Sequence, residues 1–78
     1  MTKNKEIDKT YKDVLNQLAS NVKYIRTKKL KESQEAFAHN CGTTLKVISW
    51  LERAKGSDVH TVAKIAVYTK QTVSQLFG

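Results

Sequence analysis

The sequence contains no proline and only three glycines in 78 residues, so little in it interrupts a helix. Its one cysteine, Cys41, excludes an intrachain disulfide and is typical of a reducing cytoplasm. No apolar run approaches the roughly 20 residues that span a membrane, and the opening MTKNKEIDK lacks the apolar stretch of a signal peptide. Because the chain is also too short for two domains, we expect one cytoplasmic all-α domain without a membrane segment.

Acidic residues are scarce, since 7 Asp and Glu stand against 14 Lys and Arg and the net charge is +7. Between Val14 and Lys31 the chain carries five basic residues and no acid. This balance favours a polyanionic partner, either nucleic acid or an anionic membrane surface. Lysines that only keep a small protein in solution are the alternative, and charge alone does not separate the two.

Apolar residues recur at three- and four-residue spacing in five segments, which predicts five helices. We expect a flexible basic tail over residues 1–9, followed by a domain over residues 10–78. Its first helix runs from Thr10 to about Lys28 or Lys29. Each later helix follows a residue whose side chain can accept hydrogen bonds from free backbone N–H groups. These N-cap candidates are Ser33, Thr44, either Ser57 or Asp58, and Thr72.

The second and third predicted helices form a unit over residues 33–52. Gly42 separates them and can end the second helix in a left-handed conformation without steric cost. The small Ala38 lies four residues earlier and lets two helices cross closely. This pattern predicts a helix-turn-helix, whose second helix lies in the major groove of DNA.

The same residues resemble the phage-repressor and Cro-like helix-turn-helix regulators of the XRE type. The resemblance runs from about Leu18 to Phe77 and is most specific between Ser33 and Glu52. One departure is Ala54, which stands where a glycine commonly follows the third helix. The resemblance implies a five-helix lambda-repressor-like DNA-binding domain without a cofactor. The segments that carry it are VKYIR (22–26), SQEAFA (33–38), GTT (42–44) and ISWLE (48–52).

The start of the third helix is the candidate for reading bases. If Ile48 and Leu51 face inward, about 100° per residue places Lys46 and Trp50 on the outward side. Two alternatives to base contact remain open. Leu45 and Trp50 could instead pack partly in the core or in a dimer contact, and Lys46 could instead be solvated. We expect base contacts from Thr44, Leu45, Lys46, Ser49 and Trp50.

A second group would position the protein on the sugar-phosphate backbone without reading sequence. Gln34 begins the second helix, where free N–H groups and the dipole favour an anion, and it matches the family's phosphate-binding glutamine. The resemblance also implies that Arg26 and Glu52 form a structural ion pair rather than contact DNA. The phosphate-contact candidates are Gln34, Thr43, Arg53, Lys55 and Lys23, the last of which faces either the duplex or water.

One such unit reads only a few base pairs, so we expect a homodimer on two half-sites about 34 Å apart on operator DNA. The end of the chain offers apolar residues for self-association, although ordinary core is the alternative for each. The expected output is transcriptional repression or autoregulation, in a prophage, a plasmid or a restriction-modification system. The dimer-interface candidates are Tyr68, Val73, Leu76 and Phe77.

Residues suited to catalysis or metal binding do not cluster in the sequence. His39 and Cys41 are two apart on a helix and therefore face different sides, and no CxxC or HExxH spacing occurs. We expect neither an enzyme nor a metal site. Two rival functions remain: an antitoxin that also binds a toxin partner, and a protein-interaction module on the same fold.

Overall fold

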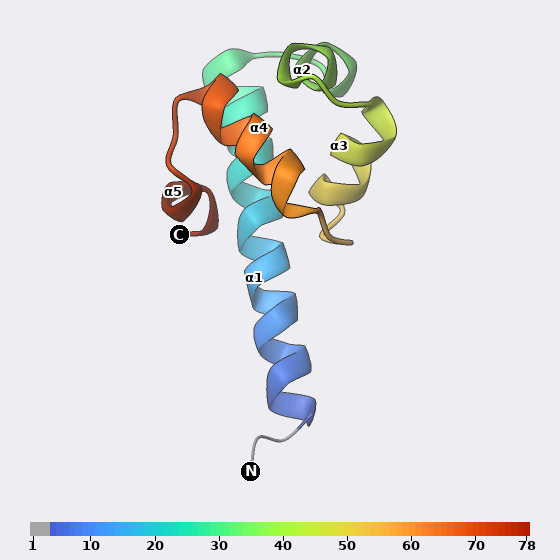
Figure 1. Cartoon of the computed structure of the whole chain (residues 1–78), viewed down its shortest axis with the longest axis vertical. Coiled ribbons are helices and arrows are strands. Elements are labelled where there is room, and N and C mark those ends of the chain that lie inside the picture. The colour runs from blue at the N-terminus through green and yellow to red at the C-terminus, as the bar shows by residue number, and fades with distance from the viewer. Residues whose placement is uncertain (1–3) are drawn as a thin grey trace.

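The computed structural model describes residues 4–78, which form an all-helical globule from which one long helix projects (Figure 1). The expected all-α class with five α-helices is confirmed for this part of the chain. None of its helices has the length and apolar character needed to cross a membrane. The elements are α1 (Asn4–Tyr24), its π-helical continuation η1 (Ile25–Leu30), α2 (Gln34–Cys41), α3 (Leu45–Glu52), α4 (Val59–Thr69) and α5 (Val73–Phe77).

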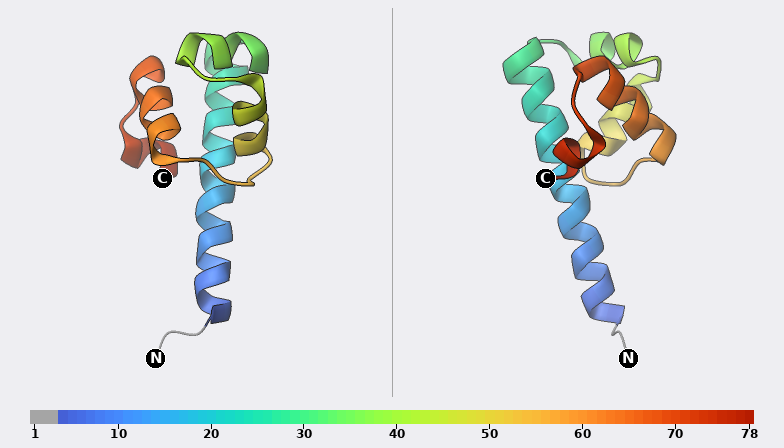
Figure 2. Two further views of the ribbon diagram at one scale, coloured as in Figure 1. Left: turned by 45° about the vertical axis from the view of Figure 1, so that its right-hand side comes forward. Right: turned by 60° about the vertical axis from the view of Figure 1, so that its left-hand side comes forward.

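Helix α1 begins earlier than the sequence pattern predicted. The expected flexible tail over residues 1–9 is wrong for residues 4–9, which form the first turns of α1, while residues 1–3 lie outside the described part. Lys and Glu are good helix formers and this segment has no Gly or Pro, so polarity alone does not prevent a helix. The first buried side chain of α1 is Leu18, and the helix before it projects from the globule (Figure 2).

The helix ends follow the predicted local chemistry. Ser33, Thr44 and Thr72 each accept a hydrogen bond from the backbone N–H three residues on, and Asp58 rather than Ser57 does the same for α4. Gly42 ends α2 at φ 78°, in the left-handed region that glycine enters without strain. The predicted turn between α2 and α3 is therefore present.

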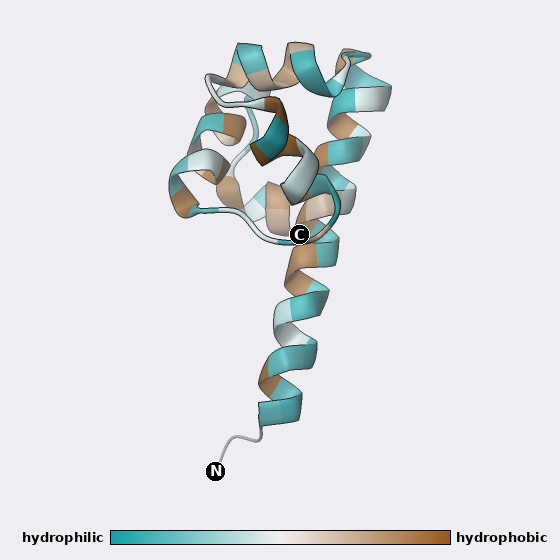
Figure 3. Ribbon diagram, turned by 90° about the vertical axis from the view of Figure 1, so that its right-hand side faces the viewer, coloured by the Kyte–Doolittle hydropathy of each residue, from teal (hydrophilic) through white to brown (hydrophobic). Residues whose placement is uncertain are grey.

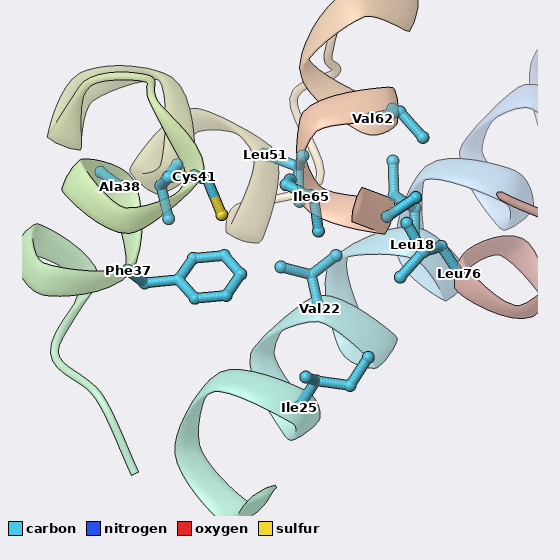
Figure 4. Packing of buried hydrophobic residues seen from close by; sticks show 12 residues of the cluster. Leu18, Val22, Ile25, Phe37, Ala38, Cys41, Leu51, Val62, Ile65 and Leu76 are labelled. Carbon is cyan, nitrogen blue, oxygen red and sulfur yellow. The ribbon is translucent and has the colours of Figure 1, made fainter. Parts of the chain in front are cut away.

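The core lies where the C-terminal half of α1 meets the four shorter helices (Figure 4). Val22 of α1, Phe37 of α2 and Ile65 of α4 have no exposed surface. Cys41 is also buried, as predicted, and desolvation raises the pKa of its thiol to about 11, so the group stays protonated.

The structure corrects one of the four residues expected in a dimer surface at the end of the chain. Leu76 is completely buried in the core, and Phe77 packs against it. Tyr68 is half-buried, with its ring edge-on to Phe37 at a centroid distance of 5.8 Å. Only Val73 of the four candidates is an exposed large hydrophobic side chain. Helix α5 therefore seals the monomer core.

Candidate nucleic-acid interface

Helix α3 has one buried side and one outward side. Ile48 and Leu51 are buried, and the hydroxyl of Thr44 accepts a hydrogen bond of 3.3 Å from the backbone N–H of Val47. The turn before α3 is fixed from the other direction, because the Lys64 ammonium donates to the Gly42 carbonyl over 3.0 Å. The start of α3 is thus held at both its turn and its buried side, which gives its outward side chains a fixed position.

The outward side of α3 carries the predicted base-contacting residues. Leu45 and Trp50 are 46% and 47% exposed. Lys46 and Thr44 are exposed as well, and Ser49 is half-buried. Thr44 has two roles open to it, because a hydroxyl that accepts the capping bond still has its own hydrogen to donate.

Arg53 joins this face, which the sequence analysis did not foresee. It was expected only to contact phosphate beyond the end of α3. In the structure its Nε donates to the Ser49 carbonyl over 3.4 Å, and its guanidinium lies 5.5 Å from the centroid of the Trp50 ring. A cation–π contact of this kind holds both side chains in place. The i, i+3 spacing of Trp50 and Arg53 is the signal that could have shown it.

Two open hollows flank the outward face of α3. Leu45 borders one of them together with His39 of α2. Lys46 and Trp50 border the other, a mostly apolar hollow that the α3–α4 loop and Tyr11 of α1 complete. Three of the five predicted base-contacting residues, Leu45, Lys46 and Trp50, therefore border a hollow.

The predicted ion pair between Arg26 and Glu52 is present and buried. Arg26 Nε donates to Glu52 Oε2 over 2.7 Å and a terminal nitrogen donates to Oε1 over 2.9 Å. The Arg26 and Glu52 side chains are 10% and 3% exposed. The bidentate bond to Glu52 raises the pKa of Arg26 above its ordinary value, against the opposing effect of burial. Arg26 also donates to the Glu32 carbonyl over 2.8 Å, so it ties η1 to both α3 and the segment before α2.

Gln34 extends this ion pair into a three-residue network. Its amide Nε2 donates to Glu52 Oε1 over 3.0 Å, a contact that sequence reasoning missed. The amide has a second hydrogen, so the predicted phosphate contact stays available to it. The network links the start of α2 to the end of α3 and satisfies both carboxylate oxygens of Glu52.

The remaining phosphate-contact candidates lie at the borders of this region. Lys55 is exposed just after α3 and borders the same hollow as Lys46. Thr43 is half-buried in the turn before α3, where its backbone N–H donates to the Ala38 carbonyl. Lys23 is exposed on the last turn of α1. Among residues 4–78, no group of three His, Cys, Asp or Glu side chains could hold a metal ion.

Comparisons of the chain with family models, with curated protein sequences and with solved structures found no match.

Proposed function

We propose that this protein is a sequence-specific regulator that binds double-stranded DNA and represses or autoregulates transcription as a homodimer on a two-half-site operator. In this proposal α2, the turn at Gly42 and α3 act as a lambda-repressor-like helix-turn-helix. The observation that carries it is the outward face of α3, where polar, cationic and large apolar side chains stand exposed on a helix anchored by Ile48 and Leu51.

The charges around α3 support this proposal. Lys46, Arg53 and Lys55 are exposed on or beside the outward face. Glu52 is the only acid of α3, and its carboxylate is buried against Arg26. The face offered to a partner is therefore cationic, which suits the phosphates that line a DNA groove.

The side chains suit different contacts with a duplex. Lys46 can donate to the O6 or N7 atoms of guanine, and Leu45 can contact the methyl group of thymine. Thr44 and Ser49 can bond to a base or a phosphate. Trp50, stacked with Arg53, suits the wall of the groove. The Gln34 amide, Thr43, Lys55 and Lys23 would contact phosphates and set the register without reading sequence.

The first test selects duplexes from a random library and measures their affinity by fluorescence anisotropy at two salt concentrations. We expect enrichment of a two-half-site sequence and an affinity that falls as salt rises. The variant Lys46→Ala removes a base donor and should change the preferred base with a loss of about 5- to 150-fold for the selected site. Lys55→Ala removes a phosphate contact and should weaken all duplexes alike.

The matched control is Lys70→Asn, which removes one positive charge at the C-terminal end of α4. Lys70 has φ 58°, a left-handed conformation that Asn tolerates, so the fold should be kept. We expect only a small loss of affinity and no change of preferred sequence. Duplex binding without salt dependence, or a Lys46→Ala/Ser49→Ala variant that still selects the parent sequence, would contradict the proposal.

A second candidate function is suggested by the outer face of α4. Val59 and Val67 are 86% and 80% exposed and lie on one side of that helix, two turns apart. Such a stripe suits a protein partner, as in an antitoxin or an interaction module. A protein that copurifies with the native chain and is lost in Val59→Ser/Val67→Ser would favour this function. Retained partner binding in that variant would count against it.

A further inference from the structure

The projecting half of α1 carries an apolar seam that its own globule leaves largely exposed. Ile7, Tyr11 and Val14 are 51%, 58% and 40% exposed, and their spacing of four and three residues places them on one face. The next residue of the same series is Leu18, which is buried in the core. Figure 3 shows hydrophobic bands along the part of α1 that stands clear of the other helices.

The projecting half, residues 4–17, has little support from the rest of the monomer. All of its side chains are exposed except Leu15, which is half-buried. It approaches the globule at Tyr11, whose hydroxyl lies near Gly56 in the α3–α4 loop. Most of the stability of a helix in a protein comes from packing of its apolar face, and the face of this segment has little packing in the monomer. The seam therefore calls for a partner.

The charge of the projecting half differs from that of the remaining chain. Residues 18–78 carry ten basic and four acidic residues, which suits a polyanion. The projecting half has no net charge, so it can approach a copy of itself without net repulsion and has no net positive charge to attract DNA. Its three lysines are Lys5, Lys9 and Lys12, and its three acids are Glu6, Asp8 and Asp13.

We propose that the seam of Ile7, Tyr11 and Val14 binds the same seam of a second copy, with the two helices antiparallel. The antiparallel direction of the two helices follows from the fold. Leu18 and Val22 continue the seam's face of α1, and the monomer's own globule covers that face. A parallel partner helix would run into the globule, whereas an antiparallel one ends where the globule begins.

The antiparallel pairing also brings apolar side chains opposite each other and opposite charges close together. It places the two-fold axis near Tyr11 and sets Ile7 opposite Val14 of the partner subunit. On one flank of the seam Asp8 comes within about one residue of the level of Lys12 of the partner subunit, and the two-fold axis repeats this opposite-charge pair. The overlap is about 21 Å long, since an α-helix rises about 1.5 Å per residue.

The association is tested by sedimentation equilibrium of the full chain from about 1 to about 500 μM. We expect the mass to rise with concentration from 8.8 kDa toward twice that value. Ile7→Glu/Val14→Glu should remain at the mass of one chain, and its core should stay intact because both positions are exposed. The control Val67→Glu places the same charge on the exposed stripe of α4 and should leave the dimer unchanged.

The charge pair is tested by exchange. Asp8→Lys should weaken the dimer several-fold, and Asp8→Lys/Lys12→Asp should restore it. A parent chain that stays at one mass at every concentration would overturn the proposal, because a different partner would then have to cover the seam. Dissociation by Val67→Glu but not by Ile7→Glu/Val14→Glu would overturn it as well, in favour of α4.

The direction is tested by disulfide trapping between two single variants, Ile7→Cys and Val14→Cys, one of which carries a mass tag. Mixed and oxidised, they should form the 7–14 heterodimer in preference to either homodimer. Cys41 should not interfere, because it is buried and its pKa is raised to about 11. Preferential 7–7 and 14–14 products would overturn the antiparallel arrangement.

This interface does not depend on the proposed function. The mass measurements contain no DNA, so a failure of DNA binding would leave them unaffected. Conversely, a protein that stays monomeric and still binds a half-site would contradict self-association through the seam and the proposed homodimer. It would leave the proposed DNA contacts of α3 intact.

Discussion

The two halves of α1 have the same apolar spacing and opposite surroundings. From Leu18 onward the stripe is covered by the other helices, with Val22 completely buried, whereas in residues 4–17 the stripe at Ile7, Tyr11 and Val14 is exposed. A periodic pattern therefore predicts that a segment is helical and which of its faces is apolar. What covers that face depends on elements far away in the sequence, and for the outer half on the second molecule that we propose.

The largest expected effect comes from the anchor at the inner end of α1. Arg26→Ala leaves the Glu52 carboxylate buried without its cation and should lower the free energy of unfolding by about 3–5 kcal/mol. Urea denaturation of the parent and the variant measures this loss in the free energy of unfolding. The control Lys23→Ala removes an exposed cation from the same helix and should have an effect near zero. Full stability combined with lost DNA affinity in Arg26→Ala would instead assign this residue to the DNA interface.

The comparison between the two halves is tested directly by one substitution made in each. Val22→Ala opens a cavity in the core and should lower the free energy of unfolding by about 2 kcal/mol. Val14→Ala removes an exposed side chain. At a concentration where sedimentation gives the mass of one chain, it should change the free energy of unfolding by less than about 0.5 kcal/mol. Equal losses would mean that the outer half is also part of a monomer core.

The smallest effect is expected in the α3–α4 loop that Tyr11 of the outer half approaches. Ala54 has φ 59°, a left-handed conformation that strains any residue with a Cβ. Ala54→Gly should raise the free energy of unfolding by about 0.5–1 kcal/mol. The matched change Ala63→Gly, within α4, should lower it by about 1 kcal/mol, because glycine weakens helix interiors. Thermal melts of both variants would show shifts of opposite sign.

The local features of the fold could be predicted from neighbouring residues. The caps at Ser33, Thr44 and Thr72 and the left-handed Gly42 were correct because each depends on hydrogen bonds within a few residues. Asn4 as the start of α1 was missed because local polarity was taken as a sign of disorder. Leu76 was assigned to a dimer surface, since its apolar character is equally suited to a core.

In the candidate site, too, features set by neighbouring residues could be predicted and features set by distant segments could not. The outward direction of Lys46 and Trp50 followed from the position of Ile48 and Leu51 on one helix. The hydrogen bond from Gln34 to Glu52 could not be predicted in this way. The two residues are 18 positions apart in the sequence, and the packing of α2 on α3 sets the distance between them. Likewise, the hollow between α3 and Tyr11 exists only because α1 continues past the globule.

By itself, the sequence determined the all-helical class, the helix caps, the turn at Gly42 and the apolar side of each helix, because these depend on interactions within a few residues. Only the tertiary structure decided that Leu76 closes the core, that Gln34 joins Arg26 and Glu52, and that the first half of α1 stands uncovered. Burial is a property of surfaces that distant segments bring together, and no local pattern contains it.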